Sequence, residues 1–144
     1  MGTRMKAALT TTIVFILLTY GLVALRQSKA ETDLAKNLVG KWQGEVLLPG
    51  AGGRDGPYRT LVIKSVREQD GAWAVEALYG VTGKSLRQVE VAMEVISGEA
   101  IISFRTPANS PVKLTLIKEK HLVGSFRLAG AGRREYSMKL EKVE

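Results

Sequence analysis

The chain contains no cysteine. Disulfide bonds, thiolate nucleophiles and zinc sites with cysteine ligands are therefore excluded, and so is bacterial lipid attachment through an N-terminal cysteine. With 144 residues, the chain is long enough for one domain and too short for two. An exported domain of this size without disulfides must be stable through its hydrophobic core alone.

Histidine is almost absent, because His121 is the only one. A single histidine cannot form a multi-histidine metal site. It lies between Lys120 and Leu122 in a segment where we expect a tight turn. We therefore expect a solvated turn residue rather than a ligand or a general base, and we expect no metal and no cofactor.

Catalytic motifs are also lacking. Gly80–Ser85 resembles a phosphate-binding loop, but Leu78 stands where the motif needs its first glycine. No Gly-x-Ser-x-Gly motif occurs. The glutamates of the expected strands fall on outward faces, where paired carboxylates would have no cleft: Glu45, Glu76, Glu90 and Glu94. We therefore expect a protein that is not an enzyme.

The positive charge is unevenly distributed. The net charge is +7, but residues 1–30 hold four basic residues and no acidic one, which leaves seventeen basic and fourteen acidic residues in the remainder. The densest basic cluster is Arg127, Arg133 and Arg134, around one loop. We expect solvated strand faces and turns there, and no nucleic-acid partner.

The N-terminus has the order of a secretory signal. Two basic residues in 1–6 precede an uncharged run over 7–25, and Ser28-Lys29-Ala30 supplies small residues before Glu31. The run of 19 residues is also nearly long enough for an uncleaved signal anchor. Both alternatives place the rest of the chain outside the cytoplasm: periplasmic or extracellular after cleavage, or membrane-anchored through the N-terminal segment without it.

The remaining sequence indicates eight strands without a helical period. We expect a leader helix in 1–30, a linker or short helical turn in 31–37 and a β domain in 38–144. The expected strands cover 38–48, 58–68, 72–81, 88–95, 100–106, 112–118, 122–128 and 134–143. Apolar residues alternate with polar ones along each of them, which gives each strand one dry face.

Turns and faces agree with one another. Asp70-Gly71 and Ser97-Gly98 are two-residue hairpin signals, and the second would pair Met93 with Ile102. Val66 is out of phase with Ile63, so we expect a bulge near Lys64-Ser65. A three-residue connection over 119–121 keeps the dry faces of its two strands on one side. An antiparallel up-and-down meander of eight strands removes its edges by closing into a barrel; a two-sheet sandwich is the alternative.

The start of the β domain, Gly40-Lys41-Trp42, resembles the Gly-x-Trp signature on the first strand of lipocalins and other calycins. The span 38–143 is similar to a compact lipocalin-like or streptavidin-like eight-stranded barrel of exported bacterial proteins. The resemblance implies that Trp42 closes the barrel floor against an arginine from a late strand, either Arg127 or Arg134. The chain lacks the C-terminal helix of lipocalins and the aromatic and polar set that holds biotin in avidins, so no family ligand is implied.

The barrel interior and its outer wall are the candidate sites. Trp73, Tyr79, Phe104 and Tyr136 either line a ligand cavity or fill the interior themselves. Ile101, Ile117 and Val123 face outward on three consecutive strands and form a candidate interaction patch. Two functions follow: a carrier of a small apolar ligand, or a filled barrel that serves as a protein-interaction or envelope-structural module.

Overall fold

The computed structural model describes residues 29–47, 58–127 and 135–144. The chain divides into two units, Met1–Asp33 and Leu34–Glu144, and all the strands described below belong to the second. The leader helix was expected in 1–30, and residues 1–28 of it lie outside the described residues. Within the described ranges, no helix has both the length and the apolar character needed to cross a membrane.

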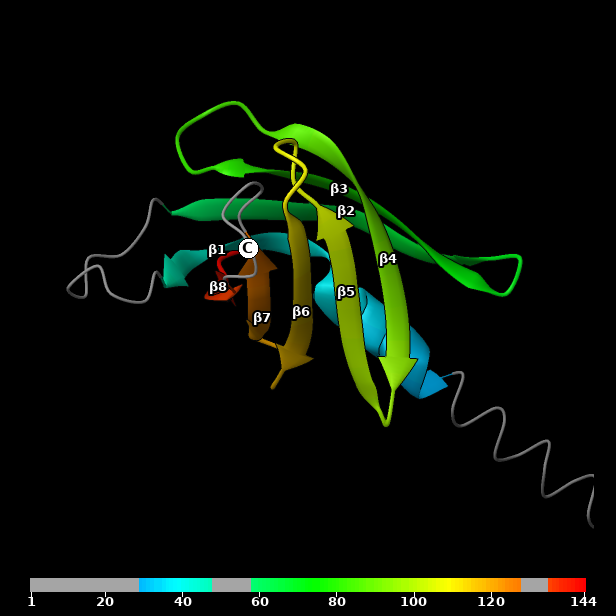
Figure 1. The fold of residues 1–144 in the computed structure, drawn as a ribbon. Coiled ribbons are helices and arrows are strands. Elements are labelled where there is room, and N and C mark those ends of the chain that lie inside the picture. Colours follow the sequence, from blue (N-terminus) through cyan, green and yellow to red (C-terminus); the bar gives the residue numbers. More distant parts are fainter. Residues whose placement is uncertain (1–28, 48–57, 128–134) are drawn as a thin grey trace, which may run out of the picture. The chain divides into compact units, whose positions relative to one another are not determined.

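Eight antiparallel strands form one closed barrel in which each strand pairs with its neighbours in the chain and β8 pairs with β1 (Figure 1). The barrel confirms the predicted up-and-down architecture, and the sandwich alternative is wrong. The strands are β1 (Gly40–Leu47), β2 (Arg59–Gln69), β3 (Ala72–Val81), β4 (Arg87–Ile96), β5 (Glu99–Arg105), β6 (Pro111–Ile117), β7 (His121–Arg127) and β8 (Glu135–Lys142).

The two predicted hairpin turns are confirmed. Asp70 and Gly71 have φ of 52° and 77°, and Ser97 and Gly98 have φ of 52° and 79°. Positive φ at both central residues is the type I′ geometry, whose twist matches that of the flanking strands. The second turn brings Met93 opposite Ile102, as predicted.

Two local irregularities were also expected. The β2–β3 register shifts between Ile63 and Ser65, which confirms the bulge. The connection between β6 and β7 has three residues, but it covers 118–120 rather than 119–121, because Ile117 pairs with His121. The dry faces still match because the connection remains odd in length, and His121 becomes the first residue of a strand.

The strand β4 changes its partner midway. Its residues Arg87–Val91 pair with β3, whereas Val91–Ile96 pair with β5. In the described ladders, the first four residues of β4 therefore have no partner on β5. β4 and β5 therefore separate before Val91, over Arg87–Glu90, and this separation shapes a groove on the outer wall.

Side chains fill the middle of the barrel. The largest fully buried ones include Trp42, Leu61, Ile63, Ile102, Leu114, Leu122, Met138 and Leu140. Gly44 is required at the β1–β8 seam, because a Cβ at this position would lie 1.9 Å from the carbonyl oxygen of Lys139. A close approach of two backbones at such a point is open only to glycine.

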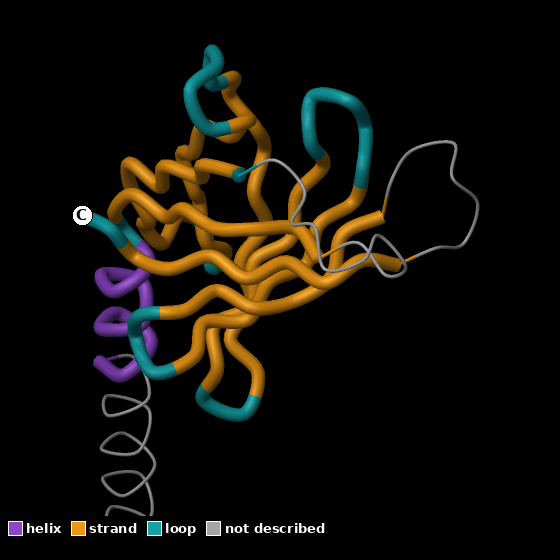
Figure 2. Tube along the Cα trace, turned by 90° about the vertical axis from the view of Figure 1, so that its left-hand side faces the viewer, coloured by secondary structure: helices purple, strands orange, loops and turns teal. Residues whose placement is uncertain are grey.

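One end of the barrel, which we call the floor, is closed by Trp42 and the end of the helix over 29–38. Leu38 and Trp42 are fully buried, and Trp42 Nε1 donates a hydrogen bond of 2.9 Å to the carbonyl oxygen of Leu38. Figure 2 shows the end of the chain beside the end of this helix, and Lys41 N donates to the carbonyl oxygen of Glu144 at 3.0 Å.

The cation at the floor is a lysine, not the arginine that the resemblance implied. Trp42 lies directly opposite Lys142 on β8, and Lys142 Nζ lies 5.4 Å from the centroid of the tryptophan ring. The same Nζ donates a hydrogen bond of 2.8 Å to the carbonyl oxygen of Asn37. Arg127 lies at the other end of the barrel and pairs with Glu135, and Arg134 lies outside the described residues.

Candidate functional site

The end of the barrel opposite Trp42 differs from the floor. The up-and-down order brings together at this end the starts of even-numbered strands and the ends of odd-numbered strands. We call this end the mouth; its strand-end residues are Leu47, Arg59, Val81, Arg87, Arg105, Pro111, Arg127 and Glu135. Four of these eight are arginines and one is a glutamate, so the strand ends give the mouth a net positive charge.

The mouth contains a cavity of about 280 Å³. Its inner wall is formed by Tyr79 and Phe126, both of which are buried. Its rim comes from two connections, residues 82–86 between β3 and β4 and residues 106–110 between β5 and β6. The remaining lining residues are Arg59, Gly80, Val81, Lys84, Ser85, Arg87, Thr106, Pro107, Ala108 and Ser110.

Backbone hydrogen bonds hold the connection over 106–110 in place. Thr106 N donates to the carbonyl oxygen of Ser110 at 2.9 Å, and Ser110 N donates to Thr106 Oγ1 at 3.1 Å. Asn109 takes a positive φ of 64°, and its N donates to the carbonyl oxygen of Thr106 at 2.8 Å. Asparagine tolerates this conformation better than most residues. This side of the rim is therefore formed before any ligand arrives.

The connection over 82–86 is fixed in the same way. Thr82 N donates to the carbonyl oxygen of Tyr58 at 2.8 Å, and the hydroxyls of Thr60 and Thr82 lie 2.8 Å apart in a hydrogen bond. Lys84 N donates to the carbonyl oxygen of Val81 at 3.0 Å. These bonds position Lys84 and the start of β4 on the rim.

Tyr79 is the polar group at the inner wall of the cavity. Its side chain is 4% exposed, and its hydroxyl forms no hydrogen bond with a described residue. Burial raises the pKa of Tyr79 above its ordinary value, and Arg59 opposes this shift through its positive charge and a polar contact with the hydroxyl that falls short of hydrogen-bond geometry. The phenol is therefore neutral at physiological pH and keeps its O–H. Its ring meets the edge of Phe104, with centroids 5.2 Å apart.

A wider groove of about 960 Å³ runs along the outer wall from β4 to β8. It enters the wall where β4 and β5 separate, so that Val91 and Phe104 line it together with outward-facing residues such as Lys113. Trp73 also lines this groove.

The four aromatic residues proposed as ligand walls do not line one cavity. Tyr79 lines the mouth cavity, whereas Trp73 and Phe104 line the groove. Tyr136 is half-buried and packs against Phe126, with ring centroids 6.5 Å apart. Sequence reasoning missed the contribution of Phe126 and of the rim cations. The signal was an arginine within one residue of the end of several expected strands, and the barrel topology brings these arginines to one end.

The candidate interaction patch lies on adjacent strands. Ile101 and Val123 are half-buried and flank Thr115 in one row across β5, β6 and β7. Ile117 lies two residues further along β6 and is 41% exposed. The three aliphatic residues are therefore neighbours but are not contiguous, because the hydroxyl of Thr115 separates two of them.

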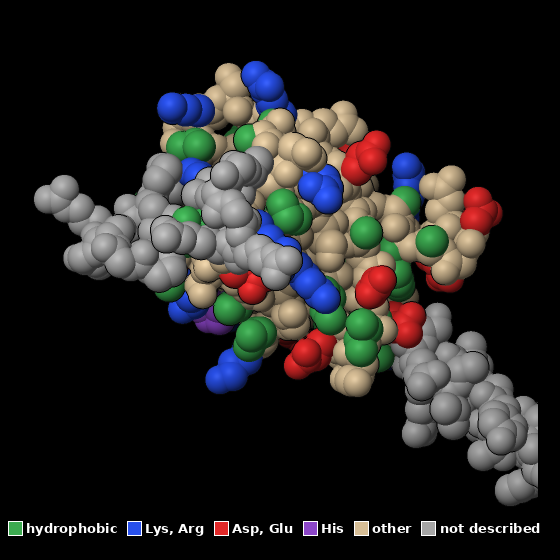
Figure 3. Space-filling model, viewed as in Figure 1, with side chains coloured by type: hydrophobic (Ala, Val, Ile, Leu, Met, Phe, Trp, Pro, Cys, Tyr) green, Lys and Arg blue, Asp and Glu red, His purple; other side chains and the backbone are tan. Residues whose placement is uncertain are grey.

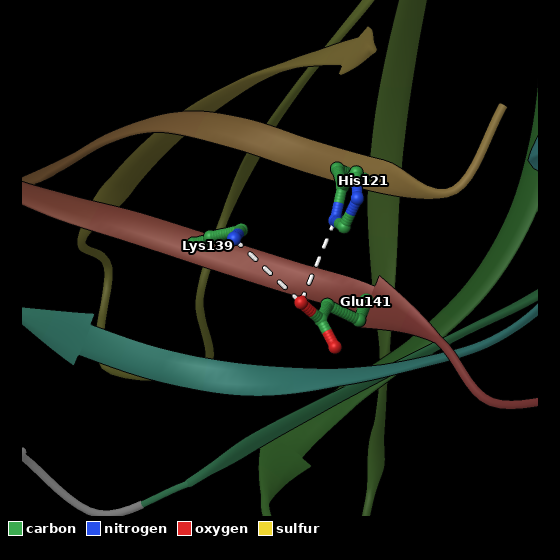
Figure 4. Close-up of polar contacts among 3 residues, drawn as sticks. All are labelled: His121, Lys139 and Glu141. Atoms are coloured by element: carbon green, nitrogen blue, oxygen red, sulfur yellow. Dashed lines mark ion pairs between the residues drawn. The ribbon is translucent and has the colours of Figure 1, made fainter. Parts of the chain in front are cut away.

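His121 belongs to an ion-pair cluster on the outer wall, far along the strands from the mouth. Glu141 Oε1 lies 3.6 Å from His121 Nδ1 and 3.6 Å from Lys139 Nζ (Figure 4). These side chains come from β7 and β8, and Glu141 and Lys139 are largely exposed. Among the described residues, no group of three or more His, Cys, Asp or Glu side chains could hold a metal ion.

Comparison with known proteins identifies no relative. No protein-family model matches the chain, and neither a curated protein nor a solved structure matches it.

Proposed function

We propose that this chain is a non-catalytic binding protein that takes a small, largely apolar ligand at the mouth of its barrel. The observation that carries the proposal is the mouth cavity with Tyr79 and Phe126 at its inner wall. Ligand sites are typically concave and mostly apolar, with a few polar groups that orient the ligand. The middle of the barrel is packed, so the ligand would rest on the core at the mouth rather than pass through it.

The position of Gly40-Lys41-Trp42 supports a relation to the calycins within this proposal. The three residues begin β1, and Trp42 is fully buried at the floor beside a cation from the last strand. A lipocalin-like protein of the exported class would combine this sealed floor with an open mouth.

Export rests on the N-terminal sequence alone. We propose a periplasmic or extracellular location after cleavage before Glu31, with membrane anchoring through residues 7–25 as the alternative. Edman sequencing of the protein isolated from its host separates the two. Recovery of Glu31 as the first residue supports cleavage, and recovery of Met1 or its neighbours contradicts it.

Binding at the mouth can be tested with a neutral fluorescent probe. Phenylnaphthylamine is apolar and carries no charge, and we expect saturable binding to the full-length protein. Ala108→Phe places a large side chain on the rim of the mouth cavity and should abolish this binding. Ala92→Phe makes the same change in the groove and is the matched control.

The two variants distinguish the mouth from the groove. Loss of probe binding in A92F but not in A108F would move the ligand site to the groove and contradict the proposal. Absence of saturable binding in the wild-type protein, with no small molecule retained in native mass spectrometry of protein from its own host, would also contradict it.

The second candidate is a filled barrel that acts as a protein-interaction or envelope-structural module. The buried core and the exposed Ile117 favour this function. Ile117→Asp, beside Lys113→Asp as a control on the same strand, tests it. A partner that co-purifies with the wild-type and K113D proteins but not with I117D would support the module.

A further inference from the structure

We propose that the ligand of the mouth is an amphipathic organic anion, whose acidic group binds among Arg59, Lys84 and Arg87. The inference rests on the proposed function and specifies the chemistry of its ligand. All three cations line the mouth cavity. They come from the start of β2, from the β3–β4 connection and from the start of β4, so the fold brings together residues that are up to 28 positions apart in the chain.

The cavity is lined by charge of one sign. No Asp or Glu lines it within the part of the chain that the structure describes. Lys84 and Arg87 are exposed and form no ion pair with another described residue. Figure 3 shows Lys and Arg side chains at the upper left of the molecule, with Asp or Glu side chains further to the right. A concave site lined by one sign of charge focuses its field and attracts the opposite charge.

Two further cations of this end point to partners outside the mouth cavity. Arg127 Nη2 lies 3.3 Å from Glu135 Oε1. Arg105 Nη1 lies 3.3 Å from the carbonyl oxygen of Asn109, to which it donates a hydrogen bond. Neither residue lines the mouth cavity. The positive charge that faces the cavity is therefore specific to Arg59, Lys84 and Arg87 and is not a general property of the rim.

The inner wall requires an apolar body on the same ligand. The rings of Phe126 and Tyr79, together with Val81 and Pro107, form an apolar surface that an inorganic anion would leave uncovered. The hydroxyl of Tyr79 is buried without a hydrogen bond to a described residue. It would donate to an oxygen of the acidic group or of a polar substituent beside it. A ring or short chain that carries one carboxylate, sulfonate or phosphate fits both halves of the cavity.

Two probes that differ by one charged group show how much the negative charge of a ligand contributes to binding. Anilinonaphthalene sulfonate is phenylnaphthylamine with one added sulfonate. A purely apolar site prefers the neutral compound, because the sulfonate is better solvated in water. We expect the opposite order for this protein, with the sulfonate bound at least about tenfold more tightly, because a paired charge in a partly buried site outweighs its desolvation. Its affinity should fall as NaCl rises from about 50 mM to about 500 mM, since salt screens the exposed cations.

Variants that remove positive charges show which side chains bind the sulfonate. Lys84→Gln with Arg87→Gln removes two exposed cations and should weaken binding of the sulfonate at least about fivefold, a larger change than for the neutral probe. Adding Arg59→Gln should weaken it further. If this triple variant does not fold, the double variant carries the test alone. The control for net charge is Lys64→Gln with Arg67→Gln, which removes two cations on β2 away from the mouth and should change neither probe.

The outcomes separate the two proposals. If the neutral probe binds at the mouth and the sulfonate binds no more tightly, the anion inference is wrong and the proposed function stands. If neither probe binds, the proposed function fails first. If inorganic phosphate at millimolar concentration displaces the sulfonate as well as a short-chain carboxylate does, the site selects a free anion, and the amphipathic part of the inference is overturned.

Discussion

The two ends of this barrel are built from the same strands but serve different physical purposes. At the floor, Trp42 is fully buried, its Nε1 is hydrogen-bonded and its ring lies beside Lys142. At the mouth, Tyr79 is also buried, but its hydroxyl has no hydrogen bond to a described residue and its side chain lines a cavity. Satisfied polar groups and dense packing stabilise a fold, whereas an unsatisfied group beside a cavity is available to a ligand.

The largest expected effect tests the floor. Trp42→Ala should lower the free energy of unfolding by about 3–5 kcal/mol, because it removes a large buried ring and leaves a void. Urea denaturation followed by circular dichroism measures the change, and Trp42→Phe provides a graded variant if the alanine variant is unfolded. Trp73→Ala is the matched control. Trp73 is only half-buried, so Trp73→Ala should lower the free energy of unfolding clearly less than Trp42→Ala does. Equal changes in the two variants would show that the floor contributes no more to stability than the outer wall.

A smaller effect tests the cation at the floor. Lys142→Met keeps the apolar stem but removes the charge over Trp42 and the hydrogen bond to Asn37. We expect a loss of about 1–2 kcal/mol from these two interactions together. Lys139→Met on the same strand removes only an exposed pair with Glu141 and should cost less than about 0.5 kcal/mol. Equal effects of the two variants would show that Lys142 is not part of the closure.

At the mouth, Tyr79→Phe should not lower the free energy of unfolding, in contrast to the variants at the floor. It removes a buried hydroxyl without a hydrogen bond to a described residue, so the variant should be as stable as the wild-type protein or more stable by up to about 1 kcal/mol at neutral pH. A loss of more than about 1 kcal/mol would show that the hydroxyl is satisfied in the folded protein and that the two ends are alike.

The stability difference between Tyr79→Phe and the wild-type protein should change with pH in one direction. Burial raises the pKa of Tyr79 in the folded protein, so the unfolded chain loses this proton first as the pH rises. The unfolded state then binds fewer protons than the folded state, and stability falls with pH. The contribution of Tyr79 is therefore fully present below about pH 10, its unfolded pKa, and is lost as the pH rises toward the folded value. The stability advantage of Y79F should grow over this range, and a constant difference would contradict it.

The smallest effect on stability is expected at the rim. Lys84→Gln with Arg87→Gln changes exposed side chains without ion pairs to described residues, so the free energy of unfolding should change by less than about 0.5 kcal/mol. Thermal denaturation is sufficient to measure this. A variant that binds the anionic probe poorly while it unfolds like the wild-type protein would separate ligand binding from stability most clearly.

Much of the fold was predictable because its signals are local. Asp70-Gly71 and Ser97-Gly98 determine their turns, and the alternation of Val89, Val91 and Met93 determines which face of β4 is buried. The registers of neighbouring strands follow from turns and faces together. The position of the β6–β7 turn was wrong by one residue, because an odd connection of three residues fits either position equally well.

The candidate site was less predictable because it is assembled from distant residues. The sequence identified Tyr79 as an aromatic residue on a dry face, but it did not separate the residues that fill the barrel from those that line a cavity. Phe104 lies opposite Val91, where the pairing of β4 with β5 begins, and lines the groove, whereas Tyr79 lines the mouth cavity. No local pattern specifies where two strands separate.

The sequence by itself determined eight strands, their dry faces and the buried position of Trp42, because alternation and turn chemistry act between near neighbours in the chain. Only the tertiary structure decided which cation accompanies Trp42 and which cations face a cavity. Those choices depend on barrel closure, which brings Lys142 opposite Trp42 and gathers Arg59, Lys84 and Arg87 at one end. Closure joins residues that are about 100 positions apart at the floor, and such contacts are set by packing and register rather than by local preference.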